Sequence, residues 1–217
     1  MLKQKYFLTG IFILSAERQP IKLAWRKIVW LPDDWQYTNA GLEDAYHIVY
    51  YIPRDQDLTD WSKKVSACKQ KVDQNIIKEC VNALNIEGLH FDYVIRMMGH
   101  KETIPQKNVP IRSLAVAIAN ATGAKYLPQL LHKKKETTPM HFLSLAERQV
   151  EINDVFQVND RTYNLNEKKI LIVDDITTTC TTVTEMIKTL KKVWPKAIFY
   201  LFCIARTSHD EHANENL

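Results

Sequence analysis

The segment that most constrains this chain is residues 170–182, which read ILIVDDITTTCTT. Its first four residues are apolar, a pattern typical of a strand that is buried on both faces of a sheet. Two aspartates stand where this strand is expected to end, and a threonine-rich stretch follows. The apolar spacing over Thr181–Val193 then predicts a helix. The segment therefore predicts a strand, a loop and a helix, in that order.

A strand followed by a loop and a helix provides a natural site for an anion. Ligands of open parallel sheets bind beyond the carboxyl ends of the strands, where a helix N-terminus offers unpaired N–H groups and partial positive charge. An ionised carboxylate accepts two hydrogen bonds side by side, which suits the vicinal hydroxyls of a ribose. We therefore predict that Asp174 and Asp175 bind a ribose. Its 5-phosphate is assigned to Thr177, Thr178, Thr179, Cys180, Thr181 and Thr182.

The second part of the chain alternates between strand and helix patterns, which predicts an α/β fold with a parallel sheet covered by helices on both faces. The predicted strands are Phe91–Met98, Tyr126–Leu131, Lys169–Val173 and Ala197–Ala205, and a helix is predicted from Pro110 to Ala121. The charged stretch His132–Val150 lacks a clear period, so we expect a mobile segment there.

The first part of the chain predicts a β-rich and then helical elaboration. Lys5–Ser15, Ile21–Trp30 and Tyr46–Ile52 have strand composition, and a helix, whole or in two pieces, is expected from Asp60 to Leu84 with Thr59 as its cap. We therefore divide the chain into an N-terminal elaboration (1–89), a core (90–206) and a frayed polar tail (207–217).

Composition excludes several classes of protein. The net charge of +4 is too small to indicate a nucleic-acid binder. No apolar run is long enough to span a membrane, and no signal peptide is visible. The four cysteines are scattered without a C-x-x-C pair, which argues against a zinc site and favours a cytoplasmic protein with reduced thiols.

The stretch from Ile170 to Thr182 resembles the phosphoribosyl-diphosphate motif of type I phosphoribosyltransferases: an apolar run, Asp-Asp, two variable residues, Thr-Thr-Gly, one residue and Thr. The resemblance extends over Phe91–Arg206 and is strongest to the competence protein F-like, or amidophosphoribosyltransferase-like, branch. There an arginine and a phenylalanine precede the motif, as Arg148 and Phe156 do here. Glu151 stands where an asparagine is usual, and the branch's zinc module is missing.

The resemblance implies binding of phosphoribosyl diphosphate with Mg²⁺, which is held through the ligand and water. It implies a pentosyltransferase that transfers the phosphoribosyl group to a nitrogen acceptor and releases pyrophosphate, with Asp174 and Asp175 at the reaction centre. By position in the family pattern, Gly99, His100 and Lys101 would bind the pyrophosphate. A flexible loop with Lys133, Lys134, Lys135 and Arg148 would close over the site. Residues 1–89 would form a hood, and a homodimer or a protein partner would use that region.

One residue departs from the motif, because Cys180 stands where the family has glycine. Cysteine is expected to fit only with a negative φ and with its side chain directed away from the ligand. This departure and the missing asparagine leave open a sensor module that binds phosphoribosyl diphosphate or a nucleotide without catalysis. The aromatic N-terminal region leaves open a protein-interaction subunit. The lysine run and the Gly-His-Lys loop also have a simpler reading, as solvated surface.

Overall fold

A six-stranded sheet forms the centre of the computed structural model, which describes residues 23–28, 41–53, 60–84, 88, 90–215 and 217. The strand order is β1-β2-β8-β7-β3-β4. Among these strands the β1–β2 pair is antiparallel and the other four pairs are parallel. The strands are β1 (Arg26–Lys27), β2 (Leu42–Tyr51), β3 (Tyr93–Arg96), β4 (Lys125–Tyr126), β7 (Lys169–Thr177) and β8 (Ile198–Thr207). The predicted α/β fold with a parallel sheet is confirmed.

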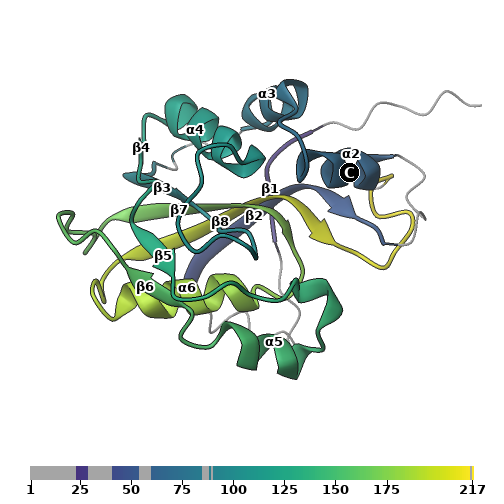
Figure 1. The fold of residues 1–217 in the computed structure, drawn as a ribbon. Coiled ribbons are helices and arrows are strands. Elements are labelled where there is room, and N and C mark those ends of the chain that lie inside the picture. Colours follow the sequence, from purple (N-terminus) through teal and green to yellow (C-terminus); the bar gives the residue numbers. More distant parts are fainter. Residues whose placement is uncertain (1–22, 29–40, 54–59, 85–87, 89, 216) are drawn as a thin grey trace, which may run out of the picture.

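Helices cover both faces of this sheet (Figure 1). One face carries α2 (Trp61–Cys68), α3 (Gln74–Asn82) and α4 (Pro110–Thr122). The other face carries α6 (Thr181–Lys191), α5 (Leu145–Ile152) and a small antiparallel sheet of β5 (Leu131–Lys133) and β6 (Phe156–Val158). Two apolar cores, one per face, hold these layers together.

Strand β7 shows why the apolar run of the sequence is continuous. Ile170 and Ile172 pack into the core beneath α6, whereas Leu171 and Val173 pack into the core beneath α2, α3 and α4. All four side chains are fully buried. Successive side chains of a strand point to opposite faces, so a strand with a helix layer on each side needs apolar residues at every position.

Strand β2 lies within residues 1–89, which the sequence assigned to an N-terminal elaboration. It lies inside the main sheet, parallel to β8, with Ala45 opposite Leu201 and Val49 opposite Ala205. The sheet is therefore not confined to residues 90–206, and residues 42–51 are part of it rather than of a hood. The helix expected from Asp60 to Leu84 is present as two helices, α2 and α3.

The charged stretch 132–150 was expected to be a mobile segment, but the structure assigns it regular elements. It contains part of β5, a 3₁₀ turn η1 (Met140–Phe142) and most of α5. Helix α5 has a complete capping box, in which Ser144 and Glu147 exchange hydrogen bonds with each other's backbone N–H groups. The strand predicted over Tyr126–Leu131 is likewise divided, between β4 and β5.

The tail from Thr207 to Leu217 was expected to fray, and this prediction is wrong for Asn214. The Asn214 side chain is fully buried. Its amide oxygen accepts a hydrogen bond from Tyr50 N (2.7 Å), and its amide nitrogen donates to Tyr50 O (3.0 Å). One side chain thus satisfies both backbone polar groups of Tyr50, as a neighbouring strand would.

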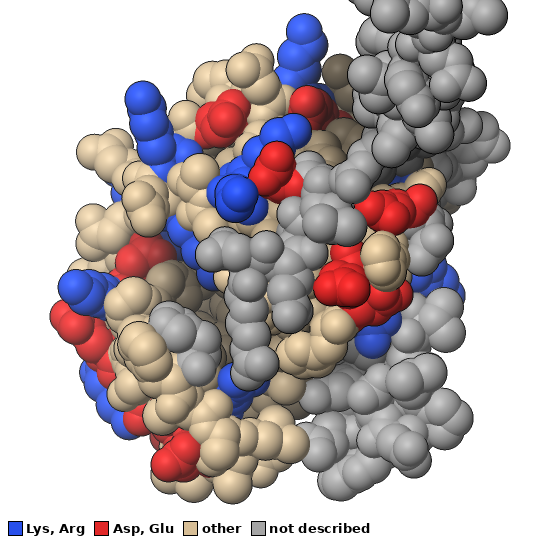
Figure 2. All heavy atoms as spheres, turned by 90° about the vertical axis from the view of Figure 1, so that its right-hand side faces the viewer, with Lys and Arg blue, Asp and Glu red and all other residues tan. Residues whose placement is uncertain are grey.

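Some predictions fall on residues outside the described ranges: the strand Lys5–Ser15, the two ends of Ile21–Trp30 and the Thr59 cap. No helix among the described residues is long and apolar enough to cross a membrane. Lysine and arginine side chains are interspersed with acidic ones over the described part of the face in Figure 2.

Candidate functional site

A cleft of about 560 Å³ lies at the carboxyl ends of β3 and β7. It gathers residues from three predicted groups, which are far apart in the sequence. They are Gly99, His100 and Lys101, then Arg148, and finally Asp174, Asp175 and the segment from Thr177 to Thr182. The cleft forms because β3 and β7 pair only as far as Arg96 and Val173, while β7 continues to Thr177 against β8.

The sequence suggested that the two aspartates follow the end of the strand. They lie inside β7 instead, because this strand continues to Thr177. Both line the cleft and are partly exposed. Each also holds the backbone of the next residue: Asp174 Oδ1 accepts from Asp175 N (2.9 Å), and Asp175 Oδ1 accepts from Ile176 N (2.6 Å). These backbone bonds use one oxygen of each carboxylate; the second oxygen of Asp175 faces Lys69.

Burial raises the pKa of Asp174 well above its ordinary value, and the neighbouring Asp175 carboxylate raises it further. Two adjacent carboxylates in a poorly solvated place resist being ionised together. Perturbed pKa values of this kind cluster at functional sites, and a bound cation or hydrogen-bond donor would compensate the charge that burial disfavours.

Lys69 was not predicted from the sequence, although it lines the same cleft. It follows the end of α2, and its Nζ lies 3.8 Å from Asp175 Oδ2. The ion pair is half exposed on the lysine side, so its contribution to stability is small. Its importance is positional, because it places a cation from the N-terminal region beside the acidic pair.

The threonine-rich loop divides into an inner and an outer set. Thr177 and Cys180 are buried, and their side chains contact each other at 3.1 Å. Thr178, Thr179, Thr181 and Thr182 remain at least partly exposed in the cleft. The side chains of the outer set are therefore the candidates for phosphate contacts, whereas those of Thr177 and Cys180 support the loop from below.

Helix α6 begins at this loop with Cys180 as its N-cap, and no side chain caps its N–H groups. The first turn of a helix carries unpaired N–H donors that attract anions. Thr184 secures the start of the helix, because both its N–H and its hydroxyl donate to Cys180 O, at 2.8 and 2.9 Å. The loop and the helix start therefore form a cradle suited to a phosphate.

Cys180 has a φ of 51°, in the left-handed region. The expectation of a negative φ is wrong: the backbone has the conformation that favours glycine, and cysteine adopts it. The second expectation holds, since the side chain is buried in the core beneath α6. Burial also raises the pKa of the Cys180 thiol to about 11, which argues against a nucleophilic thiolate.

Replacing Cys180 by glycine and by alanine separates backbone strain from packing. Both variants lose the buried sulfur, but only glycine relieves the left-handed conformation, which costs other residues roughly 1–2 kcal/mol. We expect Cys180→Gly to be more stable than Cys180→Ala by about 1 kcal/mol. Urea unfolding of the two variants measures the difference, and equal stabilities would contradict the strain.

The loop after β3 is organised by a buried ion pair. Arg96 Nη2 and Nη1 donate to the two oxygens of Glu102 at 2.6 and 2.9 Å, and both side chains are buried. Glu102 also accepts from Gly99 N (2.7 Å) and Gln106 N (2.8 Å). The Gly99 N–H, which was predicted to bind pyrophosphate, is therefore already bonded to a carboxylate. In this conformation the cleft offers His100 and Lys101, both exposed, for that role.

Burial of Glu102 disfavours its charge, but hydrogen bonds from Arg96, Gln106 and Gly99 outweigh this effect and lower its pKa. The carboxylate is thus charged and occupies the place in the loop where an external anion was expected. A ligand that needs the Gly99 N–H must first displace Glu102.

Lys133 was predicted to lie in a flexible loop that closes over the site. The structure places it in β5 instead, where it supports the cleft from beneath. Its side chain is buried, and Nζ donates to Gly99 O (3.1 Å), His100 O (3.0 Å) and Thr137 Oγ1 (2.9 Å). Burial lowers its pKa to about 8. Lys134 and Lys135 form surface ion pairs with Asp154 and Glu151, and neither lines the cleft.

Arg148 is the member of that group which does reach the cleft. Its Nε donates to Met140 O and Leu143 O, at 2.9 and 3.0 Å, which fixes the side chain against η1. Its Nη1 lies 3.5 Å from Thr179 Oγ1. A guanidinium at this distance from the threonine loop can add charge to a phosphate bound there.

The fold is similar to that of adenine phosphoribosyltransferase. One crystal structure of that enzyme matches with 14% identity and a TM-score of 0.40, over 67% of this chain and 77% of that one. A second, from Saccharomyces cerevisiae with D-2,5-dideoxy-2,5-imino-altritol 1,6-bisphosphate and adenine, matches with 12% identity and a TM-score of 0.39, over 65% and 75%. No protein-family model and no curated protein matches the chain.

Two other predicted family positions have structural roles. Phe156 is fully buried in the core beneath α6. Glu151 accepts a hydrogen bond from Thr138 N (2.6 Å), so it holds the segment before η1. The described residues contain no group of three or more His, Cys, Asp or Glu side chains able to hold a metal ion.

Proposed function

We propose that this protein binds phosphoribosyl diphosphate in the cleft and transfers its phosphoribosyl group to a nitrogen acceptor. The observation that carries the proposal is the placement of two carboxylates and an uncapped helix N-terminus in one cleft, joined by a single threonine loop. Carboxylates suit the ribose hydroxyls, and the helix start suits the 5-phosphate. The motif resemblance supports the same ligand, and a type I phosphoribosyltransferase is the family it indicates.

The transfer breaks the bond between the anomeric carbon and a diphosphate oxygen, and the electron pair leaves with the diphosphate. A lone pair of the acceptor nitrogen forms the new bond to that carbon, and the proton on the nitrogen passes to water. Positive charge develops at the anomeric carbon during this step. The carboxylates of Asp174 and Asp175 lie in the cleft to stabilise it, while Lys101 and Arg148 supply charge for the phosphates.

The cleft fits Mg²⁺ as a companion of this ligand. Asp174 and Asp175 offer the carboxylate oxygens that Mg²⁺ prefers, and Mg²⁺ usually keeps several waters and shares substrate phosphates. With two carboxylates present and no larger ligand group among the described residues, the ion would be held largely through the diphosphate and water. When bound, it supplies positive charge to the diphosphate oxygens.

The position of the Glu102 carboxylate supports a second candidate function, that of a sensor that binds the ligand without catalysis. Its carboxylate already holds the Gly99 N–H, so a bound diphosphate would lack that donor or would have to remodel the loop. In this alternative the protein binds phosphoribosyl diphosphate, but releases no pyrophosphate with any nitrogen acceptor.

Calorimetric titration with phosphoribosyl diphosphate and Mg²⁺ tests the binding. We expect the double variant Asp174→Asn/Asp175→Asn to lose Mg²⁺-dependent binding, because both oxygen pairs lose their charge. The control Asp160→Asn/Asp210→Asn removes two aspartates at the surface, outside the cleft, and is expected to bind as the unchanged protein does. Unchanged binding by the first variant would refute the site. Pyrophosphate release by the unchanged protein separates the enzyme from the sensor.

A further inference from the structure

A smaller pocket opens from the cleft on the side of Asp175 that faces the N-terminal helices. It has a volume of about 160 Å³, far more than the roughly 10–15 Å³ that one water occupies on this measure. The two hollows share six lining residues: Lys69, Gly99, Glu102, Val109, Ile111 and Asp175. A molecule in the pocket would therefore lie beside a ribose held by Asp175.

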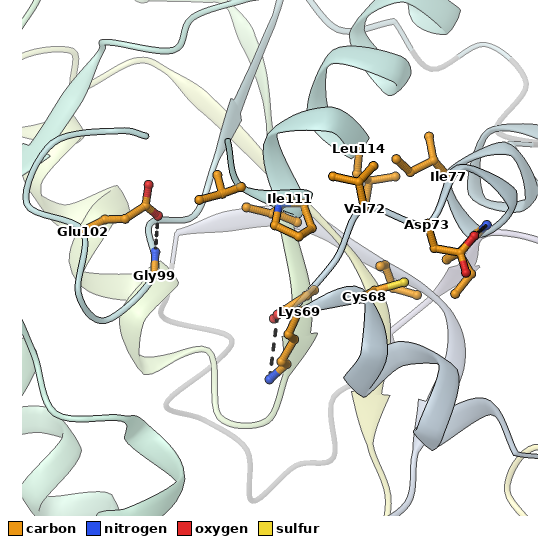
Figure 3. A pocket seen from close by; sticks show the side chains of 14 residues that line it. Cys68, Lys69, Val72, Asp73, Ile77, Gly99, Glu102, Ile111 and Leu114 are labelled. Atoms are coloured by element: carbon orange, nitrogen blue, oxygen red, sulfur yellow. Dashed lines mark hydrogen bonds and ion pairs between the residues drawn. The ribbon is translucent and has the colours of Figure 1, made fainter. Parts of the chain in front are cut away.

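The walls of this pocket are aliphatic. Val72, Ile76 and Ile77 come from the segment that joins α2 to α3 and from α3, while Ile111 and Leu114 come from α4. Figure 3 shows Val72, Ile77, Ile111 and Leu114 gathered on one side, with Lys69 on the opposite side. Apolar walls favour an occupant with an apolar body, because both surfaces leave water.

The polar groups at the pocket select against anions. Of its described lining residues, Asp73, Glu102 and Asp175 are acidic and Lys69 is basic, and the charge of Glu102 is offset by Arg96. That lysine, Lys69, is paired with Asp175. A carboxylate on the occupant would lose water and would meet like charges, which is costly.

We propose that this pocket binds the acceptor, a small uncharged nitrogen heterocycle, with its nucleophilic nitrogen directed at the ribose beside Asp175. The inference rests on the proposed function and adds its substrate class. The heterocycle's nitrogen lone pair forms the bond to the anomeric carbon, diphosphate leaves with the electron pair of the broken bond, and the nitrogen's proton passes to water. Aromatic carboxylic acids are excluded as acceptors.

Benzimidazole and benzimidazole-5-carboxylate are a matched pair of probes for this pocket. With phosphoribosyl diphosphate and Mg²⁺ present, we expect calorimetry to show benzimidazole binding at least about tenfold more tightly than its carboxylate, because the cation among the described lining residues, Lys69, is already paired with Asp175. Equal affinities for the two probes would overturn the substrate class.

The variant Val72→Phe tests the location, because it fills the pocket without touching the carboxylates. We expect it to weaken benzimidazole binding by about tenfold or more and to leave binding of phosphoribosyl diphosphate unchanged. Val81→Phe is the matched control: it makes the same change in α3 outside the pocket and is expected to keep both affinities. Circular dichroism checks that both variants fold.

The outcomes distinguish this inference from the proposed function. If phosphoribosyl diphosphate binds but Val72→Phe leaves benzimidazole binding unchanged, the pocket assignment is wrong and the proposed function stands. If phosphoribosyl diphosphate fails to bind the unchanged protein, the proposed function falls, and the acceptor role of the pocket falls with it.

Discussion

The variant Asp174→Asn is expected to raise the free energy of unfolding at pH 7 by about 1–3 kcal/mol while it weakens binding of phosphoribosyl diphosphate. The reason is that burial and the Asp175 carboxylate raise the pKa of Asp174 in the folded protein. Its ionisation therefore opposes folding, and asparagine has nearly the same shape without the charge. Its side-chain oxygen can still accept the hydrogen bond from Asp175 N.

The direction of this pKa shift determines how the free energy of unfolding changes with pH. A group with a raised folded pKa binds protons more tightly in the native state, so stability falls as the pH rises from the unfolded pKa of 3.8 through the folded value. The gain from Asp174→Asn should thus be present at pH 7 and vanish below about pH 3. Chemical unfolding at both values measures it.

Asp160 provides the control for this experiment. Hydrogen bonds from the Thr162 hydroxyl and backbone N–H lower the pKa of Asp160, so its charge is favoured in the folded protein. Asp160→Asn should bring no gain at pH 7. If Asp174→Asn also brings none, the raised pKa of Asp174 is contradicted.

The variant Arg96→Met is expected to destabilise the protein by about 3–5 kcal/mol, because it leaves the Glu102 carboxylate buried without its partner. The arginine also donates to Met97 O and Gln106 O, so the loop after β3 loses its anchor. Thermal or urea unfolding measures the loss. The exposed Arg161→Met is the control and is expected to change stability by less than about 0.5 kcal/mol.

A double variant tests whether the unpaired charge is the cause. Arg96→Met/Glu102→Gln removes the charge, yet keeps one oxygen that can accept from either the Gly99 or the Gln106 N–H, which bond to different oxygens of Glu102. It should be more stable than Arg96→Met alone by about 1–2 kcal/mol. A double variant no more stable than the single one would show that lost packing, rather than charge, explains the effect.

The strand, loop and helix around residues 170–182 were predictable, because their signals are local. Apolar residues at consecutive positions indicate burial on both faces, and the threonines before an amphipathic stretch indicate a helix start at an anion site. The structure places Asp174, Asp175 and the outer threonines in one cleft, as this pattern predicted. That these residues bind phosphoribosyl diphosphate remains a proposal.

Other parts of the site depend on contacts between distant segments, for which the sequence has no local signal. The charge on Lys133 suggested a solvated loop, but its partners are carbonyls at Gly99 and His100. Lys69 becomes relevant only when the end of α2 is brought to Asp175. Cys180 adopts a positive φ because the loop around it is fixed by packing, which no propensity reports.

Strand β8 is synthesised after both of its neighbours in the sheet, which has a consequence for how the chain folds. It lies between β2 and β7, although both precede it in the sequence. Until residues 198–207 leave the ribosome, the edges of β2 and β7 that will pair with β8 remain unpaired. Open edges of this kind pair readily with other chains. The interval before β8 emerges therefore leaves two strand edges open to such pairing.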